Sequence, residues 1–152
     1  MNTNKDYQVQ IEKIREALHC DIIALALVES AENMHVLKWQ YTSGTISERI
    51  KKVVLQSGKG IAGGVFKNGK PLLMADVEEF TVKNDLFNYP ILKLEKILSI
   101  GATPLWHSGR VVGVLLAGFR EPHLMTPERL DMLISMSKSD IGTLDGKELM
   151  WS

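Results

Sequence analysis

The sequence predicts an α+β domain built on a central antiparallel sheet. Apolar, strand-like runs occur in pairs joined by short polar turns, which favours hairpins. Segments with helical spacing of apolar residues stand before and after these runs. With 152 residues, 45% of them hydrophobic, the chain is long enough for one core, and we expect a single domain over residues 1–152.

The first half of the chain predicts a helix followed by a hairpin. Apolar residues recur at helical spacing from Tyr7 to Leu18, and the nearly continuous apolar run that follows is typical of a buried strand. Ser47 is a candidate N-cap of a short helix. The expected elements are a helix at 7–18, a strand at 22–28, a turn at 29–33, a strand at 34–41 and a helix at 47–55.

The second half predicts three more strands and a final helix. Pro90 disfavours helical backbone at Tyr89, so the segment around it is expected to be irregular. Thr126 followed by Pro127 is a strong helix start. The expected elements are a strand at 71–75, an irregular segment at 76–96, strands at 97–105 and 111–119 joined by a turn at 107–110, and a helix with Leu130, Leu133, Ile134, Ser137 and Ile141 on one face.

Glycines gather before and inside another short helical segment, Gly58-Lys59-Gly60-Ile61-Ala62-Gly63-Gly64-Val65. Glycine allows backbone to approach a ligand closely, and the first N–H groups of a helix lack intrahelical acceptors. The helix dipole makes that end favourable for negative charge. No side chain with an obvious catalytic role lies in this stretch, which therefore predicts binding of something small.

Charge and composition exclude several function classes. Eighteen basic residues balance eighteen acidic ones, so we expect neither nucleic acid nor a membrane surface as a partner. The longest apolar run, 111–119, is too short to span a bilayer, and the polar N-terminus predicts no secretory signal. The single cysteine, Cys20, has no internal disulfide partner. These features favour a cytoplasmic location.

The glycine stretch, continued by Gly69-Lys70-Pro71-Leu72 and Asp76-Val77, resembles the signature of GAF domains. The later segments Ser99 to Leu105 and Val111 to Leu115 are similar to the paired strands that close the GAF sheet. The resemblance covers residues 5–142. It implies a sensory module with the N- and C-terminal helices on one face of the sheet. It also implies a ligand pocket under loops and short helices on the other face.

Among stand-alone members of the family, the chain is most similar to bacterial nitrate receptors. This resemblance implies a nitrate site formed by Trp39, by backbone N–H groups of Ile61 and Ala62, and by Tyr89 and Ile91 in a Tyr-Pro-Ile segment. It also implies a role for the chain, which offers no room for an output domain. That role is to modulate an oxygen-sensing histidine kinase of a two-component system that controls nitrate respiration.

The chemistry of these residues agrees with that resemblance. Nitrate only accepts hydrogen bonds, and an indole Nε1–H only donates them, so Trp39 suits it. Neutral donors in apolar surroundings favour a weakly hydrated anion over phosphate, which would lose more solvation. The sequence leaves nitrate, nitrite and other weakly hydrated anions open. A tryptophan in a strand is also an ordinary core residue.

Two other function classes are alternatives. The chain could bind another small ligand, or be a ligand-free interaction module that forms a homodimer through its first and last helices. An enzyme is disfavoured, because the GAF branch that reduces free methionine sulfoxide needs two cysteines and this chain has only Cys20. The four histidines are scattered without metal-ligand spacing, so we expect no metal and no cofactor.

Overall fold

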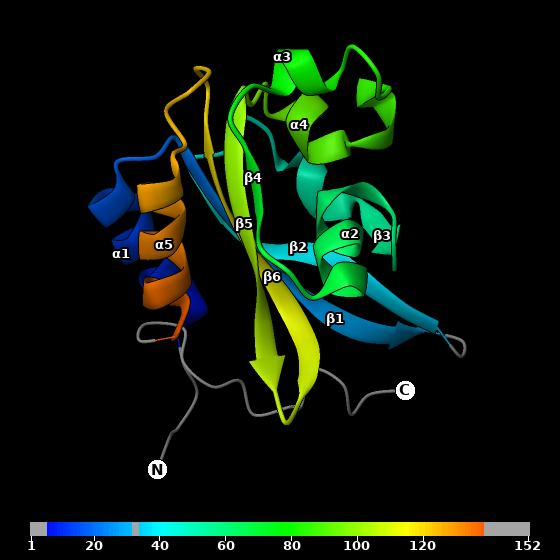
Figure 1. Cartoon of the computed structure of the whole chain (residues 1–152). Coiled ribbons are helices and arrows are strands. Elements are labelled where there is room, and N and C mark those ends of the chain that lie inside the picture. Colours follow the sequence, from blue (N-terminus) through cyan, green and yellow to red (C-terminus); the bar gives the residue numbers. More distant parts are fainter. Residues whose placement is uncertain (1–5, 32–33, 139–152) are drawn as a thin grey trace.

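One antiparallel sheet divides the protein into two layers of helices (Figure 1). The computed structural model describes residues 6–31 and 34–138. Within these residues the six strands have the order β3-β2-β1-β6-β5-β4. The strands are β1 (Ile22–Ala31), β2 (Met34–Ser43), β3 (Val54–Gln56), β4 (Leu72–Met74), β5 (Ser99–His107) and β6 (Arg110–Phe119). The helices are α1 (Tyr7–Leu18), η1 (Glu48–Lys52), α2 (Gly60–Asn68), α3 (Val77–Phe80), η2 (Leu86–Asn88), α4 (Pro90–Leu94) and α5 (Pro127–Met136).

The predicted first hairpin is confirmed, but β1 extends further than predicted. β1 and β2 remain paired as far as Ala31 opposite Met34, so residues 29–31 belong to the strand. The polar residues at the end of β1 lowered its strand signal, but ladder hydrogen bonds to β2 hold the backbone extended there. Residues 32–33 lie outside the described part of the chain.

The predicted helix at 47–55 is wrong at its second half. A 3₁₀ helix, η1, ends at Lys52, and the next residues form β3, which pairs with β2 so that Leu55 lies opposite Leu37. The Ser47 cap is confirmed, because its Oγ accepts a hydrogen bond from the Arg49 N–H at 3.1 Å. The conformation of this segment depends on pairing with β2. The spacing of apolar residues along the sequence does not reveal such pairing.

The remaining elements follow the predicted order with shifted ends. β5 begins at Ser99 rather than at residue 97, and the turn to β6 is reduced to Ser108 and Gly109. The segment expected to be irregular, 76–96, holds three short helices, α3, η2 and α4. α5 begins at Pro127 with Thr126 as its cap, as predicted, and its Oγ1 accepts from the Arg129 N–H at 3.2 Å.

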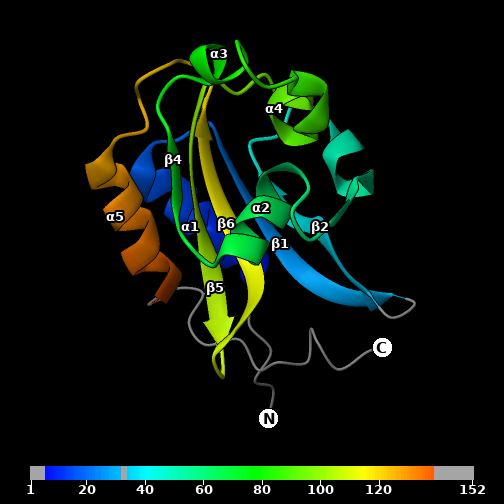
Figure 2. The same ribbon diagram turned by 45° about the vertical axis from the view of Figure 1, so that its right-hand side comes forward.

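The two faces of the sheet bury different sets of side chains. From residue 22 to residue 27 the side chains of β1 alternate: Ile22, Ala24 and Ala26 belong to the cluster under α2 and α4, while Ile23, Leu25 and Leu27 belong to the cluster under α1 and α5. Burial on both faces explains why β1 reads as a continuous apolar run. Figures 1 and 2 agree that α1 and α5 cover one face, whereas α2, α3 and α4 lie on the other. This arrangement confirms the expected layers.

Two findings concern the ends of the chain and membranes. In the described residues no helix has the length and apolar character that a membrane crossing needs. Ile141, expected on the apolar face of the last helix, and the tail 142–152 lie outside the described residues. The homodimer, the cytoplasmic location and the single domain over residues 1–152 stay predictions.

Candidate functional site

The glycine stretch builds the start of α2 tightly against the end of β3. Gly60 has φ +65°, a conformation that side chains with a Cβ rarely adopt. A Cβ at Gly63 would stand 2.2 Å from the carbonyl oxygen of Gln56, so only glycine lets the two backbones approach this closely. The glycines therefore serve the local backbone path, and this path fixes where the first N–H groups of α2 lie.

α2 begins without a side-chain cap. Lys59 occupies the N-cap position, its side chain makes no capping hydrogen bond, and it is exposed, as is usual for a loop lysine. The Gly63 N–H reaches the Lys59 carbonyl at 3.0 Å, but the N–H groups of Ile61 and Ala62 have no acceptor within the described chain. These two residues are 3% and 0% exposed. Buried backbone donors are nearly always paired, so this site has two donors available for a ligand.

The Tyr-Pro-Ile segment repeats this arrangement at the start of α4. Tyr89 occupies the N-cap position without a side-chain hydrogen bond to the helix, and its backbone has φ −129° and ψ 74°, as expected before proline. Pro90 has no N–H to donate. The next N–H, that of Ile91, has no acceptor in the parts of the chain that the structure describes, and Ile91 is 2% exposed.

Trp39 lies on β2 with its side chain in the cluster beneath α2 and α4. It is 1% exposed and stands opposite Ala26 of β1, whose small side chain leaves room for the indole. Across residues 6–31 and 34–138, no hydrogen bond from the indole Nε1–H to a protein group is found. The buried side-chain polar atom that lacks a partner there is His107 Nδ1 and not this nitrogen, so Nε1 keeps some contact with solvent-sized space although the residue as a whole is buried.

The structure brings the predicted site residues together. Trp39, Ile61, Ala62 and Ile91 belong to one buried cluster, and Tyr89 packs against it. They come from three elements, β2, α2 and α4, that are far apart in the sequence. The unpaired groups named above are all neutral donors in apolar surroundings. Such a set suits a small ligand that only accepts hydrogen bonds.

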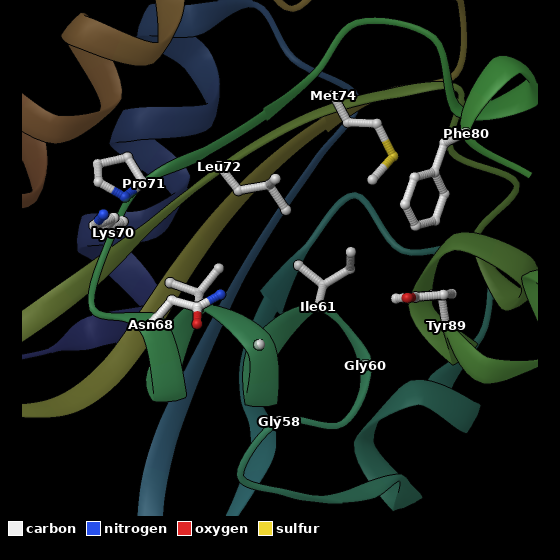
Figure 3. A pocket seen from close by; sticks show the side chains of 12 residues that line it. Gly58, Gly60, Ile61, Asn68, Lys70, Pro71, Leu72, Met74, Phe80 and Tyr89 are labelled. Carbon is white, nitrogen blue, oxygen red and sulfur yellow. The ribbon is translucent and has the colours of Figure 1, made fainter. Parts of the chain in front are cut away.

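A pocket of about 590 Å³ opens beside this cluster (Figure 3). Its walls come from α2 and the loop before it, from Leu72 and Met74 of β4, and from Phe80 and Tyr89. Of the predicted site residues, Ile61 and Tyr89 line this pocket, whereas Trp39, Ala62 and Ile91 do not. The pocket therefore reaches one wall of the cluster that holds the unpaired donors.

A buried ion pair that the sequence did not reveal anchors the far end of α4. The carboxylate of Glu95 is fully buried and accepts hydrogen bonds from Arg120 Nη2 at 2.7 Å and from the Ile46 N–H at 2.8 Å. The Ser47 N–H also contacts it, at 3.3 Å. The loop after β2 and the residue after β6 are thereby joined to α4. A lone glutamate after a helix gives no sequence signal of this role.

Cys20 lies on the opposite face of the sheet, in the cluster beneath α1 and α5. Burial raises the pKa of its thiol from 9.0 to about 12, so almost none of it is thiolate near neutral pH. A buried thiol that stays protonated is typical of a structural cysteine. The part of the chain that the structure describes contains no group of three or more His, Cys, Asp or Glu side chains placed to hold a metal ion.

Comparison with known proteins places this geometry in a family. The family model for GAF domains matches residues 8–139. A hypothetical protein from Staphylococcus aureus has 35% sequence identity and a TM-score of 0.74, with 80% of this chain and 100% of that chain covered. A structure of NreA from Staphylococcus aureus, mutated in its nitrate binding site, has the same identity and TM-score and covers 80% of this chain and 90% of that one.

More distant structures share the fold at lower identity. A free methionine-R-sulfoxide reductase from Neisseria meningitidis has 18% identity and a TM-score of 0.68, with 86% and 71% of the two chains covered. No curated protein sequence matches the chain. The match over residues 8–139, together with 35% identity across most of two solved structures, shows that the chain belongs to the GAF domain family.

Proposed function

We propose that this protein is a non-catalytic nitrate sensor. The observation that carries the proposal is the set of unpaired N–H donors on Trp39, Ile61, Ala62 and Ile91, gathered in one apolar cluster. The 35% identity to an NreA described as having a nitrate binding site supports nitrate as the anion. In this proposal Tyr89 and nearby apolar side chains close the site around the ligand.

The size of nitrate limits how tightly it binds. It has four heavy atoms, and the best very small ligands gain at most about 1.5 kcal/mol per atom. Binding is thereby capped at roughly 6 kcal/mol, which corresponds to a dissociation constant no tighter than tens of micromolar. A sensor with this affinity releases its ligand when the supply falls.

Calorimetry and thermal shift with a series of anions test the ligand. We expect one nitrate per chain and a rise of the melting temperature with nitrate. Phosphate and sulfate, which are more strongly hydrated, should produce no comparable rise at equal ionic strength. Nitrite and iodide rank the selectivity among weakly hydrated anions. Absence of a nitrate-specific shift, or turnover of nitrate or nitrite by the purified protein, would contradict the proposal.

We further propose that the sensor acts on an oxygen-sensing histidine kinase of a two-component system that controls nitrate respiration. The proposal rests on the GAF family resemblance and on the NreA relatives. A reconstituted kinase should change its autophosphorylation when this protein is added, and nitrate should alter that change. Trp39→Phe is the matched control, because it should uncouple the effect from nitrate while leaving the protein folded. Equal kinase activity in all conditions would refute this role.

A further inference from the structure

Four of the five residues of the candidate anion site are almost fully buried. Trp39, Ile61, Ala62 and Ile91 are between 0% and 3% exposed. An anion that binds among their N–H groups must therefore cross a wall of side chains to reach them. Tyr89, the fifth residue of the predicted set, is half-buried and packs against the same cluster.

The pocket beside α2 ends at this wall. Ile61 and Tyr89 both line the pocket. Ile61 also belongs to the buried cluster, and Tyr89 packs against that cluster. In Figure 3 the Tyr89 side chain points toward Ile61 across the inner end of the pocket. At about 590 Å³ the pocket has the size of sites for drug-sized ligands, far more than four heavy atoms need.

Phe80 holds the Tyr89 ring in place. The two rings make an edge-to-face contact with centroids 5.0 Å apart and an interplanar angle of 78°. Phe80 itself ends α3, whose start is fixed by the Asp76 cap and by a hydrogen bond from the Val77 N–H to the Leu98 carbonyl at 2.9 Å. The position of the Tyr89 ring is thus tied through Phe80 to the sheet.

We propose that the pocket is the path by which the anion reaches the buried donors, and that Phe80 is a positioning residue that keeps Tyr89 closed across it. This inference rests on the proposed nitrate site. Phe80 does not contact the bound anion in this scheme; it sets the barrier that the anion crosses in both directions. A change in that barrier alters the association and dissociation rate constants together and leaves their ratio, the dissociation constant, unchanged.

Two substitutions act on the path with opposite signs. Phe80→Ala removes the edge-to-face contact, so both rate constants should rise by about three- to tenfold. Gly64→Leu should slow both rates by at least about threefold, because Gly64 lines the pocket and a Cβ there meets nothing within 4 Å. Gly64 has ordinary helical backbone, so leucine should be tolerated in α2. Val82→Ala is the control: Val82 is 80% exposed on the same segment and should change neither rate.

A nuclear magnetic resonance titration measures the nitrate dissociation constant and the dissociation rate constant together, and the association rate constant follows from their ratio. The line shape of the Trp39 indole ¹⁵N–¹H signal during nitrate titration gives the dissociation constant and the dissociation rate, and Trp39→Phe assigns the signal. Phe80→Leu, which keeps most of the volume without the ring, replaces Phe80→Ala if the alanine variant does not fold. We expect dissociation constants within about twofold of the parent protein for the Phe80 and Gly64 variants.

Distinct results would overturn the proposal. Unchanged rates in the Phe80 and Gly64 variants would show that the anion takes another path. A faster dissociation with unchanged association in Phe80→Ala would make Phe80 part of the bound state instead. A Trp39 signal that ignores nitrate in the parent protein would overturn the nitrate site itself and this inference with it, whereas normal binding with unchanged rates refutes the path alone.

Discussion

The two helices that carry predicted site residues begin in a different way from the two helices that cover the opposite face of the sheet. On one face, α1 and α5 start with side-chain caps: Asp6 accepts from the Val9 N–H and Thr126 accepts from the Arg129 N–H. On the other face, the two helices that carry predicted site residues, α2 and α4, start at Lys59 and Tyr89 without such caps. The other short helices on that face, α3 and η2, and also η1, have capping side chains.

The missing caps set α2 and α4, on the candidate binding face, apart from the other described helices on both faces of the sheet. Side-chain caps stabilise a helix start by about 1 kcal/mol, and a buried donor left unpaired costs about 1–3 kcal/mol. The chain thus satisfies its donors where helices only pack, and leaves them unsatisfied at α2 and α4, beside the Trp39 indole. Unpaired donors gathered in one apolar cluster destabilise the free protein. A ligand that accepts hydrogen bonds recovers that free energy when it binds.

The largest expected contrast concerns the face covered by α1 and α5 and uses the buried Cys20 as its probe. Because burial raises the thiol pKa to about 12, its thiolate fraction at pH 8 should be two to three orders of magnitude below that of the unfolded chain. Alkylation by iodoacetamide should therefore be at least about a hundredfold slower in the folded protein. Because the unfolded thiol ionises above pH 9 while the folded one stays protonated, the free energy of unfolding should fall as the pH rises from 9 toward 12. Rapid labelling of the native protein, read by mass spectrometry, would contradict the raised pKa of the Cys20 thiol.

The next largest effect is expected on nitrate affinity when the indole donor of Trp39, on the candidate binding face, is removed. Trp39→Phe keeps most of the packing but deletes one hydrogen bond to a charged ligand, which should cost about 1.5–3 kcal/mol, more than tenfold in nitrate affinity. In the absence of nitrate, Trp39→Phe should lower the free energy of unfolding much less than a core substitution that also breaks a hydrogen bond, because the indole donor has no protein acceptor. Calorimetry gives the affinity and denaturant unfolding gives the stability. Unchanged nitrate binding in this variant would refute the indole contact.

Most of the fold can be predicted from local patterns in the sequence, whereas the residues of the candidate site come from the resemblance to nitrate receptors and stay a prediction. The continuous apolar run of β1 and the Thr126-Pro127 start of α5 are local patterns, and the glycine stretch marks a backbone path that only glycine permits. The helix predicted for Val54 and Leu55 is wrong because their strand forms only through pairing with β2. Partnerships between distant segments leave no such local pattern.

Two residues of the site region illustrate that limit. Glu95 reads as a surface glutamate, yet Arg120 and the loop after β2 bury it completely. Phe80 reads as an ordinary apolar residue of an irregular segment, and its contact with Tyr89 emerges only when α3 and α4 are placed in space. In both cases the information lies in the tertiary arrangement, which spacing along one chain does not encode.

An engineered cap tests directly whether the missing cap on α2 serves the ligand. In Lys59→Ser the hydroxyl is placed to accept from the N–H of Ile61 or Ala62, which are the second and third residues of the helix. Compared with Lys59→Ala, which removes the same charge without adding an acceptor, the serine variant should unfold with about 1 kcal/mol more free energy. Its nitrate affinity should fall about three- to tenfold, because hydroxyl and anion compete for the same donors. Equal affinities in the two variants would show that these N–H groups do not bind the anion.

The smallest effect is expected where a side chain changes but its donor does not. Ile61→Val keeps the backbone N–H and removes one buried methylene, so the free energy of unfolding should fall by about 0.5–1.5 kcal/mol. Nitrate affinity should stay within about twofold, since the proposed contact is made by the backbone. Calorimetry on Ile61→Val and Trp39→Phe side by side separates a backbone donor from a side-chain donor. Equal losses of affinity in the two variants would mean that shape and packing, not the unpaired donors, hold the anion, and the contrast between the two faces of the sheet would then have no bearing on binding.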